Sequence, residues 1–188
     1  LVPAPAAFAA DSSAPPAVRN AGFEEPRFGP AVPGWTPTFG VGESGMSFGV
    51  TSAQAYEGTS SLLLDDANGA KALGLESDPF PVVPGASYSV SAMMKVENGS
   101  MAIYIRFFDA AGVKVGESSS FITQTNGGWT KNATSTVVPA NAATGTVLLY
   151  SSAAGITRGY ADRVGIELNR IGTFEHIGGV VKGTINED

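Results

Sequence analysis

The chain is built from short stretches of alternating apolar and polar residues, each closed by a turn signal. In "SYSVSAMMKV", residues 87–96, Tyr88, Val90 and Ala92 fall on one face of an extended strand, because successive side chains point to opposite sides. Turn sequences such as "ENGS", "DAAG" and "TNGG" separate these stretches. No stretch sustains an apolar repeat at helical spacing with matching caps. The pattern therefore predicts an all-β protein.

Nine strands are predicted from this alternation. They cover residues 46–54, 61–65, 70–76, 87–96, 101–109, 113–123, 129–138, 145–152 and 162–169. Short strands at this rhythm are typical of an antiparallel β-sandwich of jelly-roll type. The 24 glycines and 12 prolines agree with many turns, and 188 residues suffice for one such domain with its own core.

The two ends of the chain differ in composition from the predicted sandwich, which spans residues 20–169. Residues 1–19 begin "LVPAPAAFAADSS", and "AFA" at 7–9 matches the small-x-small pattern of a signal-peptidase site. We interpret residues 1–19 as a signal-peptide remnant and linker; a linker throughout is the alternative. Residues 170–188 are expected to be a linker or the start of a following domain. The predicted setting is secreted, and a monomeric domain is expected.

Charge and cysteine content exclude several classes of partner and site. The net charge is −6 and no run of Lys or Arg occurs, so neither nucleic acid nor an anionic membrane surface is an expected partner. No cysteine is present, which excludes disulfides and thiolate metal sites. No stretch is long and apolar enough to span a bilayer.

Catalytic residues are not predicted. The only histidine, His176, lies outside the predicted sandwich, which excludes a Ser-His-Asp site or a zinc site built on histidine and cysteine there. The adjacent acids at 24–25 and 65–66 would point to opposite faces of a strand. Glu76 and Asp78 alternate, but at a strand end. We interpret all of these as solvated acids. A jelly-roll glycoside hydrolase or polysaccharide lyase, which needs two facing carboxyl groups, remains the alternative.

Seven motifs follow one another between residues 20 and 169. They are "NAGFEEP", "PGWT", "AYEGTSSLLL", "VVPGASYSVSAMMKV", "YIRFFDAAGVKV", "GGWTKNATSTVVPANAATGTVLLY" and "YADRVGIEL". This succession resembles the carbohydrate-binding modules of families four, nine, sixteen and twenty-two. The resemblance implies a β-sandwich that binds a polysaccharide and is covalently linked to a secreted polysaccharide-degrading enzyme. It leaves the glycan open, and a structural spacer that binds no sugar is a third possibility.

The resemblance also implies a structural calcium ion that joins the first strand, the "EGxxSL" turn and the last strand. The matching positions are Gly22, Glu24, Glu57, Ser60 and Asp162. Calcium takes about six to eight oxygens, so glycine and serine would contribute main-chain carbonyls. Glu24 and Asp162 are the expected side-chain ligands, and the ion's role would be stability. The alternative is that these acids merely line a loop.

The glycan site is expected on the strand that contains "IYIRFF". If Ile103, Ile105 and Phe107 face the core, then Tyr104, Arg106 and Phe108 lie on the other face. Sugars present apolar C–H faces ringed by hydroxyls, so their sites combine aromatic rings with planar polar groups. Neighbouring strands are expected to add Lys71, Leu73, Glu117, Ser119 and Tyr150. Arg106 is suited to a uronate carboxylate, so alginate-like polyanions compete with neutral xylan or β-glucan.

The two tryptophans and the Tyr104 face have competing interpretations. Trp35 of "PGWT" either stacks on sugar from a loop or covers the sandwich edge. The resemblance implies that Trp129 of "GGWT" packs inside. The face that carries Tyr104 and Arg106 is alternatively a second apolar layer under a loop or neighbouring domain. Arg106 argues against that layer, because an unpaired buried cation is costly.

Overall fold

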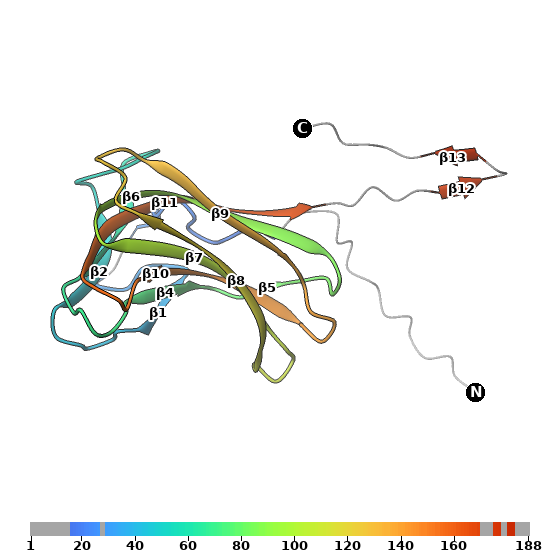
Figure 1. Cartoon of the computed structure of the whole chain (residues 1–188), viewed down its shortest axis with the longest axis horizontal. Coiled ribbons are helices and arrows are strands. Elements are labelled where there is room, and N and C mark those ends of the chain that lie inside the picture. Colours follow the sequence, from blue (N-terminus) through green and yellow to red (C-terminus); the bar gives the residue numbers. More distant parts are fainter. Residues whose placement is uncertain (1–15, 27–28, 170–174, 178–179, 183–188) are drawn as a thin grey trace.

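The computed structural model describes residues 16–26, 29–169, 175–177 and 180–182. Two antiparallel sheets face each other as a sandwich (Figure 1). The strands are β1 (Trp35–Phe39), β2 (Met46–Thr51), β3 (Ser61–Asp66), β4 (Gly74–Ser77), β5 (Phe80–Pro81), β6 (Ser87–Asn98), β7 (Ser100–Phe108), β8 (Lys114–Thr123), β9 (Thr130–Val137), β10 (Thr144–Ser151), β11 (Thr157–Asn169), β12 (Glu175–Ile177) and β13 (Val180–Lys182). The predicted all-β sandwich is confirmed. The described part of the chain contains no helix that could cross a membrane.

The order of the strands separates the sequence into two layers. Sheet A has the order β1-β4-β10-β7-β8, with β5 paired to β10, and sheet B has the order β2-β3-β11-β6-β9. Neighbours within a sheet are mostly distant in sequence, so the chain crosses repeatedly between the layers, as in a jelly roll. The strands β12 and β13 form a separate antiparallel pair.

One crossing shows how tightly the two layers are joined. Gly99 alone separates β6 of sheet B from β7 of sheet A, with φ of 73°. A Cβ there would lie 2.2 Å from the carbonyl oxygen of Ile156, so a side chain has neither room nor a favourable backbone conformation. The connection places β7 directly behind the long strand β6.

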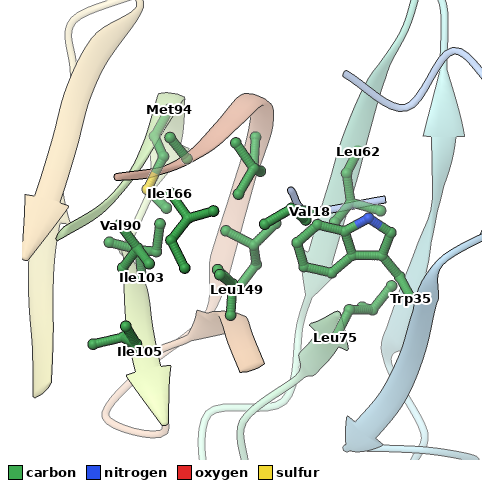
Figure 2. Packing of buried hydrophobic residues seen from close by; sticks show 14 of the residues in the cluster. Val18, Trp35, Leu62, Leu75, Val90, Met94, Ile103, Ile105, Leu149 and Ile166 are labelled. Atoms are coloured by element: carbon green, nitrogen blue, oxygen red, sulfur yellow. The ribbon is translucent and has the colours of Figure 1, made fainter. Parts of the chain in front are cut away.

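The core fills the space between the sheets. Inward residues of β7 and β10 from sheet A meet those of β3, β6 and β11 from sheet B. Figure 2 shows Trp35 between Leu62 and Leu75 at one end of this core. Trp35 is 5% exposed and its ring centroid lies 5.3 Å from that of Phe23. Burial of each large apolar side chain stabilises the fold by about 1.5–3 kcal/mol.

The predicted strands correspond to those observed except at several points: β12 and β13 were not predicted, and the strand predicted at 70–76 begins only at Gly74. The strands β1 and β5 were not predicted, because "WTPTF" contains a proline and β5 has only two residues. Strand β11 begins at Thr157 rather than at residue 162, since "TRG" at 157–159 belongs to the strand instead of forming a turn. The predicted signal remnant lies almost wholly outside the described residues, and so does most of the segment 170–188.

Candidate functional site

The outer face of sheet A carries the side chains that β7 does not place in the core. The inward residues Ile103, Ile105 and Phe107 are buried, and the alternating residues Tyr104, Arg106 and Phe108 are partly exposed, as the alternation predicts. Direct partners across antiparallel strands share a face. The outer face therefore continues through Tyr104 to Leu148 of β10 and Ser119 of β8.

An aromatic row crosses this face, formed by Phe39 of β1, Tyr150 of β10, Tyr104 of β7 and Phe121 of β8. Successive rings meet edge to face, with centroids 5.5 Å apart for Phe39–Tyr150, 5.7 Å for Tyr150–Tyr104 and 5.9 Å for Tyr104–Phe121. Phe39 is 38% exposed and Phe121 is 52% exposed. Burial raises the pKa of the Tyr150 hydroxyl, and Tyr104 and Asp66 add to the effect. The row is a continuous aromatic surface.

Gly74 of β4 makes the approach of two of these rings possible. A Cβ at this position would lie 3.0 Å from Phe39 Cδ2 and 3.2 Å from Tyr150 Cδ2. It would also lie 3.1 Å from Leu148 Cδ1. Phe39 and Tyr150 therefore meet above a strand position that has no side chain.

A charged row runs beside the aromatic row and consists of Glu76, Arg106, Glu117 and Lys114. Nη1 of Arg106 lies 2.8 Å from both carboxylate oxygens of Glu76, and Thr146 donates its hydroxyl to Glu76 Oε1 at 2.5 Å. On the other side, Arg106 Nε lies 3.6 Å from Glu117 Oε2, which accepts from Lys114 at 2.8 Å. The row is electrically balanced, since two carboxylates face two cations.

Arg106 also joins the two rows. Its Cζ lies 5.3 Å from the ring centroid of Phe108 and 5.9 Å from that of Phe39. The Arg106 side chain is 13% exposed. Ion pairing on two sides and aromatic rings close by hold the guanidinium in one orientation.

Glu76 was missed by sequence reasoning. We interpreted it as a solvated acid at a strand end, but it is 9% exposed and pairs with Arg106. The interpretation was wrong because β10 lies between β4 and β7, and Arg106 reaches Glu76 diagonally across it. No local pattern in "GLESDP" indicates that partner.

Trp35 fits one of its two predicted roles, covering the edge of the sandwich, whereas Trp129 differs from its predicted role. Trp35 is buried and its indole Nε1 donates to the carbonyl of Asn20 at 3.4 Å, so it cannot stack on a ligand. Trp129 was expected in the core, but it is only partly buried and contacts Tyr56, with ring centroids 5.9 Å apart. The "GWT" tryptophan at 35 is therefore buried at the edge of the sandwich, and the one at 129 is not a core residue.

Two other residues that were predicted to contact the glycan do not lie on the aromatic or charged row. Lys71 lies in the exposed loop between β3 and β4, where its ammonium pairs with Glu43 at 2.5 Å. Leu73 is 1% exposed and belongs to the core, so it cannot contact a ligand. The predicted positions that do lie on the outer face are Tyr104, Arg106, Phe108, Glu117, Ser119 and Tyr150.

The five residues predicted as calcium ligands lie together, and we call them the Glu24–Asp162 cluster. Gly22, Glu24, Glu57 and Asp162 line one cavity, and Ser60 donates its backbone N–H to Glu24 Oε1 at 2.7 Å. Glu24 also accepts from the backbone N–H and the hydroxyl of Thr59, each at 2.7 Å, and these bonds lower its pKa.

Asp162 holds the other side of this cluster. Its side chain is fully buried and accepts backbone N–H bonds from Tyr56 at 2.8 Å, Glu57 at 3.1 Å and Arg163 at 2.6 Å. Burial raises the pKa of Asp162 against the opposing effect of these bonds, and the negative charge of Glu24 raises it further. A buried carboxylate whose pKa is raised by a neighbouring carboxylate is a chemical environment that a cation would relieve.

The side chains of the cluster are too few to bind an oxygen-liganded cation alone, so main-chain carbonyl oxygens would be needed as further ligands. Among the described residues, no group of three or more acidic or histidine side chains is arranged to hold a metal. Phe23 and Arg163, each next to an acid of the cluster, have left-handed backbones with φ of 58° and 47°. Such conformations are costly for non-glycine residues and turn peptide groups away from regular strand geometry. Main-chain carbonyls would have to complete the set around Glu24 and Asp162.

Comparison with known proteins gives the fold a name. A module called TmCBM61, solved with β-1,4-galactotriose, is 19% identical with a TM-score of 0.53, covering 81% of this chain and 97% of its own. The xylan-binding CBM22-1 domain of Paenibacillus barcinonensis Xyn10C is 19% identical with a TM-score of 0.53, covering 79% and 91%. This is the β-sandwich fold of carbohydrate-binding modules. No protein-family profile and no curated protein matches the sequence.

The carbohydrate-binding-module fold also occurs as part of larger proteins. The enzymatically active domain of tailspike protein 4 from bacteriophage CBA120 is 16% identical with a TM-score of 0.65. The match covers 81% of this chain but only 21% of the tailspike chain. The present chain therefore spans about a fifth of that protein.

Proposed function

We propose that the outer face of sheet A binds a glycan chain and that the protein acts as a non-catalytic carbohydrate-binding module. The observation that carries the proposal is the aromatic row, whose four rings come from four strands and include two that are exposed by more than a third. A monomeric domain rarely leaves such a contiguous apolar surface in water without a function.

The chemistry of this face matches that of a sugar chain. The apolar C–H faces of sugar rings pack on aromatic rings, and their hydroxyls need donors and acceptors beside those rings. The charged row supplies both kinds of group on the same face, namely the Glu117 carboxylate opposite Arg106 and the Lys114 ammonium opposite Phe108. The fold shared with a xylan-binding domain and a galactotriose-bound module supports the same assignment.

The electrostatics favour a neutral glycan over a polyanion. The guanidinium of Arg106 faces two carboxylates, those of Glu76 and Glu117, so little positive charge is left for a uronate. The overall charge of −6 acts in the same direction. We therefore place neutral xylans, β-glucans and galactans ahead of alginate.

We further propose that the module works in a secreted protein, next to a covalently linked catalytic domain. Binding would then raise the effective concentration of that domain at its polysaccharide. The tailspike similarity supports such an arrangement, because there the matched fold is about a fifth of a longer chain that is described as an enzymatically active domain.

The test is calorimetry with a panel of soluble xylan, β-glucan, galactan and alginate. Wild type should bind one neutral glycan, and Tyr104→Ala should weaken that binding about tenfold, since it removes the middle of the aromatic row. Ser135→Ala on the outer face of sheet B, away from both rows, is the control. Equal affinity of Tyr104→Ala, Phe121→Ala and wild type would contradict the site. Release of reducing ends or unsaturated products would favour the enzyme alternative.

A second proposal concerns the Glu24–Asp162 cluster, which we propose holds a structural calcium ion. It is supported by the facing carboxylates of Glu24 and buried Asp162 and by the left-handed backbones beside them. Saturating calcium at about a hundred times its Kd would add roughly 2.7 kcal/mol to stability. Calcium should raise Tm after EDTA treatment, and Glu24→Gln should reduce this rise. An unchanged Tm with and without calcium would refute the ion.

A further inference from the structure

A second hollow lies on the opposite side of the sandwich, on the outer face of sheet B. It has a cavity volume of about 530 Å³, and its lining includes Tyr56, Ser91, Met93, Lys131, Arg163 and Glu167. Ligand pockets in proteins commonly measure roughly 300–1,000 Å³. The hollow is therefore large enough to hold one or two sugar rings.

The floor of the hollow is low because three adjacent strands place small residues side by side. Ser91 of β6 pairs with Gly165 of β11 on one side and with Ala133 of β9 on the other. The register of β11 also shifts between Asp162 and Gly165, which interrupts the regular row of side chains. The larger residues around this floor form its rim.

One wall of the hollow is an aromatic residue on a loop that is fastened in several places. Residues 52–60 join β2 to β3 and carry Tyr56, whose side chain is 42% exposed. Asp162 accepts the backbone N–H of Tyr56 and its neighbour, and Lys95 donates to Gln54 at 2.8 Å. At the far end of the loop, Glu24 accepts two further backbone N–H groups. The loop thus holds Tyr56 in place before any ligand arrives, which reduces the entropy lost on binding.

The Tyr56 ring has an aromatic neighbour, Trp129, and a cationic neighbour, Arg163. Trp129 contacts it edge to face at 5.9 Å, and Arg163 Cζ lies 6.0 Å from its centroid. The Arg163 side chain is 64% exposed, and its ion-pair partner Glu57 is 69% exposed. A large ring that stays exposed although its loop is firmly held is a feature of a binding surface.

We propose that this hollow on sheet B binds a saccharide residue and is a second site, independent of the outer face of sheet A. The Tyr56 ring would pack on the C–H face of the sugar. Ser91 offers a hydroxyl, Lys131 and Arg163 offer donors, and Glu167 offers a carboxylate acceptor. Rim groups of both signs and a serine floor suit a hydroxyl-rich ligand.

Other ligand classes fit the hollow less well. A purely apolar ligand would desolvate Lys131 and Glu167 without pairing them. Nucleic acid is disfavoured by the net charge of −6. A peptide that adds a strand bonds to the backbone of a sheet edge, whereas the floor of the hollow is centred on β6, which is already paired on both sides, with β11 and β9.

Two saccharide sites on opposite sheets would make the module bivalent. A single monomer could then hold two polysaccharide chains, or two stretches of one chain, and avidity for a dense matrix would exceed the affinity of either site. The hollow remains a site even if the outer face of sheet A binds nothing, because neither uses residues of the other.

The experiment is an NMR titration of the full chain with xylohexaose, β-1,4-galactotriose and a hexuronate oligomer, each to millimolar concentration. The backbone signals of Ser91, Lys131 and Gly165 should shift with at least one probe and saturate. The neutral and uronate probes distinguish the two kinds of sugar. Shifts confined to sheet A, or no shift at these three positions with any probe, would overturn the proposal. Shifts at sheet B without any at Tyr104 would instead refute the proposed function of sheet A.

Variants separate binding from folding at this hollow. Tyr56→Ala should weaken binding at sheet B about tenfold and leave the signals at Tyr104 responsive. Ser91→Phe should fill the hollow from an outward strand position, where an aromatic residue is compatible with the fold, without touching the bonds to Asp162. The matched control is Ser135→Ala on the same face. If Ser91→Phe folds and binds like wild type at sheet B, the hollow is not the site.

Discussion

Arg106 and Glu76 lie on strands separated by β10, and one guanidinium nitrogen of Arg106 is 2.8 Å from both oxygens of the Glu76 carboxylate. The two side chains are 13% and 12% exposed, so water screens the pair only weakly. The pair fixes the position of Arg106, the member of the charged row whose guanidinium lies beside Phe39 of the aromatic row. Stability and the proposed glycan binding would therefore depend on the same contact.

Replacement of Glu76 tests this dependence. Glu76→Gln is expected to lower the free energy of unfolding by on the order of 2 kcal/mol, because it leaves Arg106 partly buried with a single ion-pair partner, Glu117. The measurement is urea denaturation. Glu117→Gln, at a position that is 39% exposed, is the control and should cost less than about 1 kcal/mol. Equal losses in the two variants would show that burial of the pair has no energetic importance.

A methyl group at Gly74 is expected to disturb the aromatic row. Gly74→Ala places a Cβ within 3.2 Å of Phe39, Leu148 and Tyr150, so those side chains must shift. The expected loss is about 1–3 kcal/mol of stability together with weaker glycan binding. Gly69→Ala is the control, since a Cβ at that position would have nothing within 4 Å. Unaltered stability and binding in Gly74→Ala would contradict the close approach.

Trp35 and Tyr104 should separate stability from binding. Trp35→Ala is expected to cost about 3–5 kcal/mol, because it removes a buried indole from the core. Trp35→Phe should recover part of that loss and keep wild-type glycan affinity. Tyr104→Ala should show the converse, with the larger change in affinity. Denaturation and calorimetry on the same preparations measure both, and a loss of affinity in folded Trp35→Phe would restore Trp35 as a ligand contact.

Tyr150 should contribute to alkaline sensitivity. Because burial raises the pKa of its hydroxyl, the folded protein favours the neutral phenol. That contribution to stability is complete below the ordinary pKa of 10.0 and is lost as pH rises through the raised value. Tyr150→Phe, which cannot ionise, should therefore unfold less readily with rising pH than wild type. Parallel stability curves for the two proteins above pH 9 (roughly one unit below that pKa) would argue against the raised pKa.

The strands and the all-β fold could be predicted from the sequence, because the alternation of apolar and polar residues that indicates them is local. The alternation in "SYSVSAMMKV" and "AIYIRFF" specifies both the extended conformation and the face that each side chain occupies. For the same reason the outward direction of Tyr104 and Arg106 could be predicted. The strand β1 was missed because Pro37 interrupts its pattern and only pairing with β4 defines it as a strand.

The contacts between strands could not be predicted in the same way. Glu76 meets Arg106, and Phe39 meets Tyr150, only because β4 and β10 are neighbours in sheet A. Nothing in either segment indicates that order. The two "GWT" motifs make the same point, since Trp35 is buried against Phe23 while Trp129 lies beside Tyr56. The same three-residue motif therefore has a different environment at each of its two places in the fold.

The Glu24–Asp162 cluster has a mechanical consequence. Ala21 accepts a backbone hydrogen bond from Val164 at 2.8 Å, and Glu24 and Asp162 fasten the same loop from the first and last segments of the sandwich. Tension applied between the residues before Val18 and those after Asn169 would load the β6–β11 ladder at one end. At the other end it would load the Ala21–Val164 bond and the bonds from Glu24 to the loop. Under the proposed function, a module bound to a solid glycan while the rest of its chain is pulled would carry that load across this junction.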